Sequence, residues 1–315
     1  MSAESISVCE RTEEGAGGDT GRAAPGLTVA EWRFRMIRIT NKFSLYEMKI
    51  GPAFNPATAV CGSTDTHIWV RGRDLAADLM GRIGFTDYFW LLVTGAMPTS
   101  AQSRILDATL VAIAEHGLVP SVQAGRMTLA AAPEAMQGAV AAGLLGCGSV
   151  ILGSAEGAGR FLSEIARRID EGEAEESAVR TLVQEYRSQQ RAIPGYGHPL
   201  HKRSDPRAER LLAIAQEHGT AGVHTAAART VERLLPELIG KPLVLNVSGA
   251  IPAVLLDAGY PPSALKGVPL LARTAGLIAH LVEEQRRPIG FAMADAAAES
   301  IRYDGEAPAG STPKP

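Results

Sequence analysis

The chain has 315 residues, of which 46% are hydrophobic and 21% are charged. This length and composition are typical of a globular protein with about two domains. The 31 basic and 34 acidic side chains give a formal net charge of -3, which argues against a strongly basic nucleic-acid-binding protein. Aromatic residues make up only 5% of the chain, too few for a base-stacking surface, so nucleic acid is not an expected partner.

The cysteines predict neither a disulfide framework nor a zinc site. Cys9, Cys61 and Cys147 are far apart in the sequence and form no C-x-x-C pair. The histidines are also dispersed, without the spacing of metal ligands, so no metal is expected. This composition fits a protein of the reducing cytoplasm.

Two features bear on targeting and on membranes. Residues 1–27 and 302–315 are polar and rich in Gly and Pro, which predicts disordered tails, and the N-terminus lacks a signal-peptide pattern. The stretch from Glu134 to Glu156 has no charge between its ends, as a membrane span would. Because it holds many glycines and few large apolar residues, we interpret it as one or two helices at a helix–helix interface. No membrane partner is expected.

Beyond the N-terminal tail, the first element in chain order is a short β signal at His67–Val70. From residue 75 onward the apolar residues follow helical spacing, with a break at Gly84. Thr99 or Ser100 can cap a helix that ends at His116-Gly117. Further apolar helix faces are expected over residues 160–169, 179–187, 211–215, 231–238, 251–256 and 270–282. The fold class is therefore mostly α.

The most informative segment spans residues 191–207. Pro194, Gly195 and Gly197 predict a non-helical loop with accessible backbone N–H groups. Pro199 favours an extended conformation for His198. The segment therefore indicates a loop that presents a histidine and hydrogen-bond donors to a ligand.

A helix is expected directly after this loop. Asp205 is a good N-cap and Pro206 a good first helical residue, for a helix that runs to about His218. Arg207 then lies in the first turn, where the helix dipole disfavours a cation. We infer that an anion is shared between Arg207 and the helix N-terminus, with Lys202 adding positive charge.

The spacing in this segment resembles the active-site segment of the citrate synthase superfamily. A Gly-x-Gly-His motif ends at His198, a lysine follows four residues later, and Asp-Pro-Arg ends nine residues later. The resemblance extends over residues 68–288 and is closest to the citryl-CoA lyases and the C-terminal module of ATP-citrate lyase. It rests on four further blocks, at residues 69–102, Glu115-His116-Gly117, Leu245-Asn246-Val247 and Arg273–His280.

The resemblance implies a citrate-synthase-like two-domain helical fold with the active site in a cleft. The large domain would comprise residues 28–154 and 266–301, and the small domain residues 155–265. The implied substrates are a CoA thioester and a di- or tricarboxylate. Coenzyme A enters as a substrate, so no separate cofactor is expected. The implied assembly is a homodimer.

The resemblance also implies roles for individual residues. His198 would bind the oxaloacetate carbonyl that becomes the citryl hydroxyl. His116 would bind the dicarboxylate, and Arg207 and Arg273 would hold substrate carboxylates. Arg287 would contribute to the active site of the neighbouring subunit, although an exposed ion pair with Glu283 is an equal alternative. CoA would be held by the backbone of Ile193, Pro194, Gly195, Tyr196 and Gly197 and by Lys202.

One departure from the family pattern favours the lyase branch. Citrate synthases proper carry a histidine in a turn after the Gly-rich helix, and this histidine stabilises the acetyl-CoA enolate. The corresponding turn here, residues 148–153, has Leu152 at or beside that position. Leucine has no hydrogen-bond donor, and the citryl-CoA lyases also lack the histidine.

A second departure puts turnover in question. The family has a catalytic aspartate third in its Asn-Val-Asp motif, and this chain has Ser248 there. A serine hydroxyl is too weak a base unless another group activates it. His201 and Asp257 are possible substitutes, although each is better explained as structural.

Three functions therefore remain open. The first is cleavage of citryl-CoA to acetyl-CoA and oxaloacetate, and the second is citrate synthesis with a modified site. The third is a non-catalytic protein that binds CoA and a dicarboxylate. Ser248 favours the third, whereas the retained His198, Arg207, Arg273 and Lys202 favour an enzyme.

Overall fold

A computed structural model describes residues 57–148, 152–197, 203–306 and 308–310 of the chain. The described residues all belong to one compact unit, residues 52–315. The tail expected at residues 1–27 and the predicted site residues His198, His201 and Lys202 lie outside the described residues. The division into a large and a small domain stays a prediction.

The few strands form one small antiparallel sheet near the start of the described chain. Its order is β1 (Cys61–Ser63), β2 (Ile68–Val70) and β3 (Arg73–Asp74). Arg71 and Gly72 connect β2 to β3 with φ values of 51° and 76°, the left-handed pair that a tight two-residue hairpin requires. The β signal at His67–Val70 is confirmed.

Helices make up most of the remaining described residues, so the mostly α prediction is confirmed. A short π-helix (η2, Leu75–Leu79) comes before the α-helices, and a 3-10 turn (η3, Pro262–Ala264) lies between α9 and α10. The α-helices are α1 (Phe85–Thr94), α2 (Ser100–Ala114), α3 (Pro120–Ala131), α4 (Met136–Leu145), α5 (Gly153–Asp170), α6 (Glu175–Ser188), α7 (Pro206–Glu217), α8 (Val223–Ile239), α9 (Val247–Asp257), α10 (Gly267–Arg286) and α11 (Gly290–Ser300).

Two predicted helix starts are confirmed by their capping contacts. Thr99 caps α2, where its hydroxyl accepts the Gln102 N–H at 3.2 Å and the Gln102 side chain accepts the Thr99 N–H at 2.9 Å. Asp205 caps α7 by accepting the Arg207 N–H at 3.0 Å, and Pro206 is the first helical residue, as predicted. Local sequence therefore sets both boundaries.

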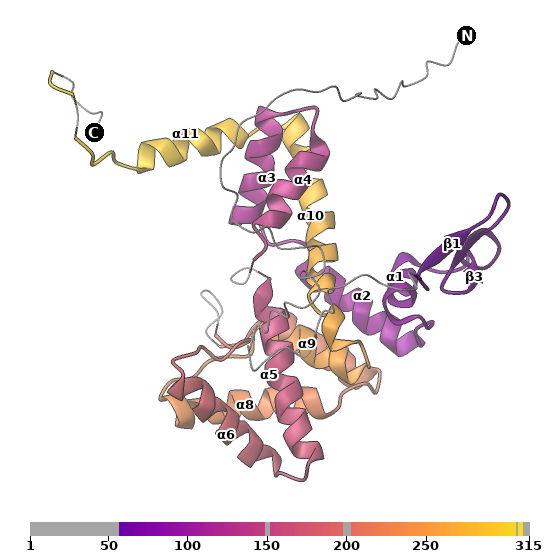
Figure 1. Ribbon diagram of the computed structural model, residues 1–315. Coiled ribbons are helices and arrows are strands. Elements are labelled where there is room, and N and C mark those ends of the chain that lie inside the picture. Colours follow the sequence, from indigo (N-terminus) through magenta and orange to yellow (C-terminus); the bar gives the residue numbers. More distant parts are fainter. Residues whose placement is uncertain (1–56, 149–151, 198–202, 307, 311–315) are drawn as a thin grey trace, which may run out of the picture. The chain divides into compact units, whose positions relative to one another are not determined.

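The Gly-rich stretch from Glu134 to Glu156 forms α4 and the start of α5, and α4 packs against α3 and α10 (Figure 1). A Cβ at Gly143 of α4 would lie 2.4 Å from a methyl of Leu277 and 2.9 Å from the carbonyl oxygen of Ser121. A Cβ at Gly125 of α3 would lie 2.8 Å from the same leucine. These glycines therefore allow three helices to approach closely, which confirms the interpretation as a helix–helix interface.

The main apolar core is built around α5, α8 and α9, with α2, α6 and α7 packed against it. At its margin Trp90 of α1 meets Tyr260 edge-to-face, with ring centroids 5.3 Å apart. Asp257, the last residue of α9, accepts the N–H groups of Gly222, His224 and Thr225 at the start of α8. This carboxylate fixes α8 against α9, which supports its interpretation as structural.

One helical segment, Pro262–Arg286, is long and apolar enough by composition to cross a membrane. Its α10 portion packs against α2, α3 and α4. A core helix of a soluble protein has the same length and composition, so this property alone carries little weight.

Candidate functional site

The predicted CoA-binding loop, residues 193–197, is joined to the start of α9 by backbone pairing. Gly197 donates its N–H to Val244 O at 2.7 Å, and Asn246 donates its N–H to Gly195 O at 3.0 Å. The Asn246 side chain then donates to Gly197 O at 2.7 Å, while its oxygen accepts the Ser248 N–H at 2.9 Å. The structure thus brings Ser248 close to the loop that leads directly into His198.

Glycine is required at two points of this junction. Gly195 has a φ of 87°, and a Cβ there would lie 2.7 Å from the Cα of Gly249 in the first turn of α9. A Cβ on Gly249 would lie 2.6 Å from Gly195 O. Tyr196 points the other way, into the core, where its hydroxyl donates to Ala228 O at 2.9 Å. The Tyr196 side chain is therefore engaged within the protein, and the predicted role of the 193–197 backbone in binding CoA stays a prediction.

Asp205 connects the start of α7 to the start of α9. Its buried carboxylate accepts the Nη2 and Nε groups of Arg207 at 2.9 and 3.1 Å, and the Val247 N–H at 3.0 Å. Burial alone would raise the pKa of Asp205, but hydrogen bonds from Arg207 and from the Val247 backbone outweigh it and hold that pKa below its ordinary value. One buried carboxylate therefore holds both the Arg207 side chain and the backbone of Val247, the residue before Ser248.

This contact modifies the inference drawn from the position of Arg207. The position of Arg207 at a helix N-terminus, which disfavours a cation, predicts a bound anion beside it. The carboxylate of Asp205 is itself such an anion. The position of Arg207 alone therefore does not require a ligand, and the case for an anion site depends on Arg273.

We expect Asp205→Asn to lower the free energy of unfolding by about 2 kcal/mol at pH 7, because the amide keeps the cap but loses the charge that faces Arg207. A carboxylate with a depressed pKa contributes its stability above the unfolded-state pKa of about 3.9 and loses it as pH falls. The difference from the parent should therefore shrink below about pH 4 in urea titrations. A difference that stays constant with pH would contradict the assignment, and Glu217→Gln, an exposed partner of Arg210, should change little.

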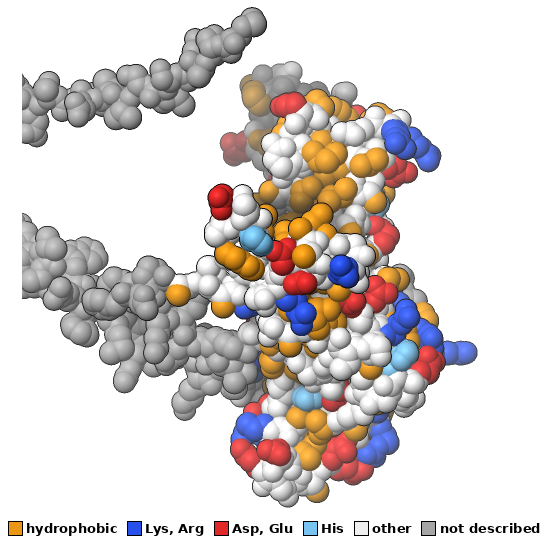
Figure 2. Space-filling view, turned by 90° about the vertical axis from the view of Figure 1, so that its right-hand side faces the viewer, with side chains coloured by type: hydrophobic (Ala, Val, Ile, Leu, Met, Phe, Trp, Pro, Cys, Tyr) orange, Lys and Arg blue, Asp and Glu red, His pale blue; other side chains and the backbone are white. Residues whose placement is uncertain are grey.

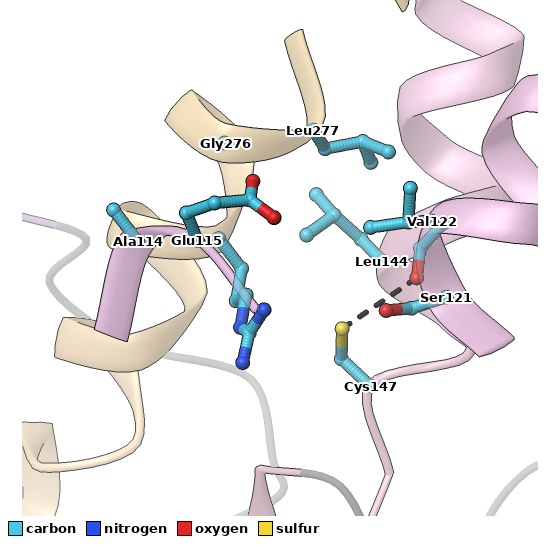
Figure 3. Close-up of a pocket in the computed structure, with 10 residues that line it drawn as sticks. Ala114, Glu115, Ser121, Val122, Leu144, Cys147, Gly276 and Leu277 are labelled. Atoms are coloured by element: carbon cyan, nitrogen blue, oxygen red, sulfur yellow. Dashed lines mark hydrogen bonds between the residues drawn. The ribbon is translucent and has the colours of Figure 1, made fainter. Parts of the chain in front are cut away.

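Arg273 of α10 is a buried cation whose Nε lacks a hydrogen-bond partner among the described residues. The residue is 6% exposed. It lines a narrow pocket between α2, α3, α4 and α10 (Figure 3), whose free space of about 10 Å³ fits one water molecule or one carboxylate oxygen. The pocket is lined by Ala114, Glu115, Ser121, Cys147, Gly276 and Leu277, among others.

Burial and nearby charges act on the pKa of Arg273 in this pocket. Burial lowers the pKa of Arg273 and the positive charge of Arg207 lowers it further, while Cys147 and Glu115 act in the opposite direction. Arg273 is buried, and its Nε has no partner among the described residues, so a bound anion would stabilise its charge. The planar, two-pronged donor of arginine fits a carboxylate.

Glu115 holds the turn that carries His116. Its Oε1 accepts the His116 N–H at 2.8 Å and also the Gly117 N–H. The same oxygen lies 3.0 Å from Nε2 of His280 on α10. His116 itself is exposed, and its predicted role in binding the dicarboxylate stays a prediction.

The remaining predicted residues lie in varied surroundings. Leu152 is buried at the start of α5. Arg287 is 82% exposed, with its Nη1 3.8 Å from Glu283, which matches the ion-pair alternative. Its predicted role in a neighbouring subunit stays a prediction. Asp257 accepts His224 Nδ1 at 2.8 Å as well as the backbone groups of α8, so its carboxylate is already engaged.

Three further residues, Glu115, Asn246 and His280, make contacts at the candidate site that the sequence alone does not predict. Asn246 carries a signal that could have identified it, since an asparagine directly before a helix is a preferred N-cap. Glu115 and His280 are 165 residues apart in the sequence. No local pattern indicates that they pair.

Comparison with known proteins agrees with this geometry. Residues 83–290 match the family described as citrate synthase, C-terminal domain. The citrate/2-methylcitrate synthase of Bacillus subtilis is 27% identical over 206 residues, which are 64% of this chain and 53% of that protein. The chain therefore spans about half the length of the curated relatives it matches.

Solved structures extend the likeness. The citryl-CoA lyase from Hydrogenobacter thermophilus is 33% identical with a TM-score of 0.72, over 81% of this chain and 97% of that one. The ATP citrate lyase of Methanosaeta concilii, solved with (3S)-citryl-CoA, is 21% identical with a TM-score of 0.65, over 82% of this chain and 43% of that one; it supports the fold alone. The chain belongs to the citrate synthase family, whose enzymes form or cleave a carbon–carbon bond.

Proposed function

We propose that this chain cleaves citryl-CoA to acetyl-CoA and oxaloacetate. The observation that carries the proposal is Arg273, a buried cation whose Nε has no hydrogen-bond partner among the described residues and whose pKa is lowered by burial and, to a lesser extent, by the charge of Arg207. Such a pair fits a substrate with several carboxylates, as citryl-CoA has. The direction of the reaction is supported by the likeness to a citryl-CoA lyase over nearly the whole of that protein. Leu152, which cannot donate a hydrogen bond to an enolate, also favours cleavage over synthesis.

The proposed reaction breaks one carbon–carbon bond. His198 takes the proton of the citryl hydroxyl, whose oxygen becomes the carbonyl of oxaloacetate as the bond to the acetyl carbon breaks. The electron pair passes to the acetyl-CoA enolate, which must then take a proton at carbon. Ser248, in the first turn of α9, stands where the family has an aspartate for this proton, so here the proton comes through water.

In this proposal one set of residues binds the substrate carboxylates and another binds coenzyme A. Arg207 and Arg273 hold carboxylates, with His116 beside them, and the 193–197 backbone with Lys202 holds coenzyme A. Arg287 acts from the neighbouring subunit of a cytoplasmic homodimer. Exposed apolar side chains, such as Leu145 and Phe291, support an interface with a second copy, and Figure 2 shows apolar side chains at the surface of one face.

Ser248 favours one alternative, a protein that binds CoA and a dicarboxylate without turnover. Both proposals are tested by adding citryl-CoA to the purified protein and coupling oxaloacetate release to NADH oxidation by malate dehydrogenase. Cleavage that is abolished by His198→Ala supports the lyase. Calorimetric binding of oxaloacetate and CoA without turnover selects the binding protein, and the absence of both would overturn both proposals.

A further inference from the structure

A chain of hydrogen bonds runs from the buried interior to the His116 turn. Arg126 of α3 is 2% exposed and donates to Glu284 at 2.7 Å and to Glu283 at 2.8 Å. Its Nη1 also lies 3.2 Å from Nδ1 of His280, whose Nε2 lies 3.0 Å from Oε1 of Glu115. Glu115 in turn accepts the two N–H groups of the turn.

The chemistry of the donors fixes the direction of this chain. A guanidinium can only donate, so Nδ1 of His280 accepts from Arg126. The proton of the neutral imidazole is then on Nε2, which donates to Glu115. His280 therefore has one arrangement that satisfies both neighbours, with the Arg126 end held by two glutamates.

Glu115 is placed to act on two residues of the candidate site. Through Oε1 it sets the backbone of His116 and Gly117. Its negative charge also favours the charged form of Arg273, which lies on α10 two helical turns before His280. The two helices meet closely here, since a Cβ at Gly276 would lie 2.1 Å from Ala114 O and 3.2 Å from Oε2 of Glu115.

We propose that His280 and Glu115 are positioning residues, which hold the His116 turn and the Arg273 stretch of α10 in place for a carboxylate ligand. The ligand part of this statement rests on the proposed function. The positioning part does not, because it concerns contacts within the chain. Neither residue needs to touch substrate.

The test compares two histidines that make similar bonds. His280 and His224 are 15% and 17% exposed, and each donates to one carboxylate, Glu115 at 3.0 Å and Asp257 at 2.8 Å. His280→Ala should speed hydrogen exchange of the His116 and Gly117 amides and weaken oxaloacetate binding about tenfold, the loss expected for one hydrogen bond to a charged group. His224→Ala should lower the melting temperature about as much as His280→Ala does. It should change neither the exchange of the His116 and Gly117 amides nor oxaloacetate binding. His280→Gln, which keeps a donor near Glu115, should recover part of the loss.

The outcomes separate the positioning role of His280 and Glu115 from the proposed function. Faster exchange at His116 and Gly117 in His280→Ala alone supports positioning, even where the parent chain binds no oxaloacetate and the proposed function fails. Unchanged exchange in His280→Ala overturns it. Equal changes in His280→Ala and His224→Ala also overturn it, because they would reflect general loss of stability.

Discussion

Replacing Arg273 by glutamine is expected to weaken oxaloacetate binding by about a hundredfold or more without destabilising the fold. Arg273 is 6% exposed, and its Nε has no hydrogen-bond partner among the described residues. Loss of a two-pronged, charge-assisted contact to a carboxylate costs at least about 3 kcal/mol of binding free energy. The neutral amide removes a buried charge for which the structure shows no ion pair among the described residues, so the melting temperature should stay constant or rise.

Arg126 is the matched control, because it is equally buried but fully paired with Glu284 and Glu283. Arg126→Gln should lower the free energy of unfolding by about 3–5 kcal/mol, since it leaves a buried carboxylate without its partner. Calorimetry and thermal melting of both variants test the contrast. A large loss of stability in Arg273→Gln with unchanged oxaloacetate affinity would show that Arg273 is structural.

Restoring the family carboxylate through Ser248→Asp is expected to raise citryl-CoA cleavage by about a hundredfold, in the lower range of general acid–base effects. Ser248 lies in the first turn of α9, where the N-terminal end of the helix favours an acidic side chain. Asn246, which caps this turn, also donates to Gly197 of the 193–197 loop, so we expect the new carboxylate to lie near the predicted thioester site.

Ser248→Ala is the control for this gain, and its rate should equal that of the parent because the hydroxyl is a weak base. The rates are compared in the coupled oxaloacetate assay. If Ser248→Asp is no faster than Ser248→Ala, residue 248 does not face the acetyl carbon. A parent rate of zero that stays at zero leads to the same conclusion.

Elements with local signals were predicted well from the sequence. The capping box at Thr99 and the Asp205-Pro206 start of α7 were predicted because capping depends on residues within one turn. The Gly-rich stretch predicted a close helix–helix interface, and Gly143 shows why, since any side chain there would clash with Leu277.

Elements without a continuous apolar stripe were missed. α3 is rich in small residues and α11 in alanine, and within α11 only Gly290 is buried, so neither has a clear helical pattern of large apolar side chains. β1 was also not predicted, because its residues Cys61–Ser63 have low strand propensity and depend on pairing with β2. The π-helix at Leu75–Leu79 matches the predicted apolar spacing but not an α-helix.

At the candidate site, too, residues in local motifs were predicted, whereas contacts that depend on tertiary packing were not. The sequence motifs predicted Arg207, Ser248 and Arg273 as site residues, and the structure connects Arg207 through Asp205 to Val247, the residue before Ser248. The role of Asp205 as the carboxylate partner of Arg207 depends on burial, which local spacing does not reveal. The contact between Glu115 and His280 likewise depends on the tertiary packing of α2 against α10.

A crystal structure of the full chain with bound citrate would test the central claim most directly, namely that Arg273 binds a substrate carboxylate. The account predicts a carboxylate oxygen within about 3.2 Å of Nε of Arg273, with a second carboxylate near Arg207. An Arg273 guanidinium that donates only to protein groups, with citrate bound elsewhere, would contradict it.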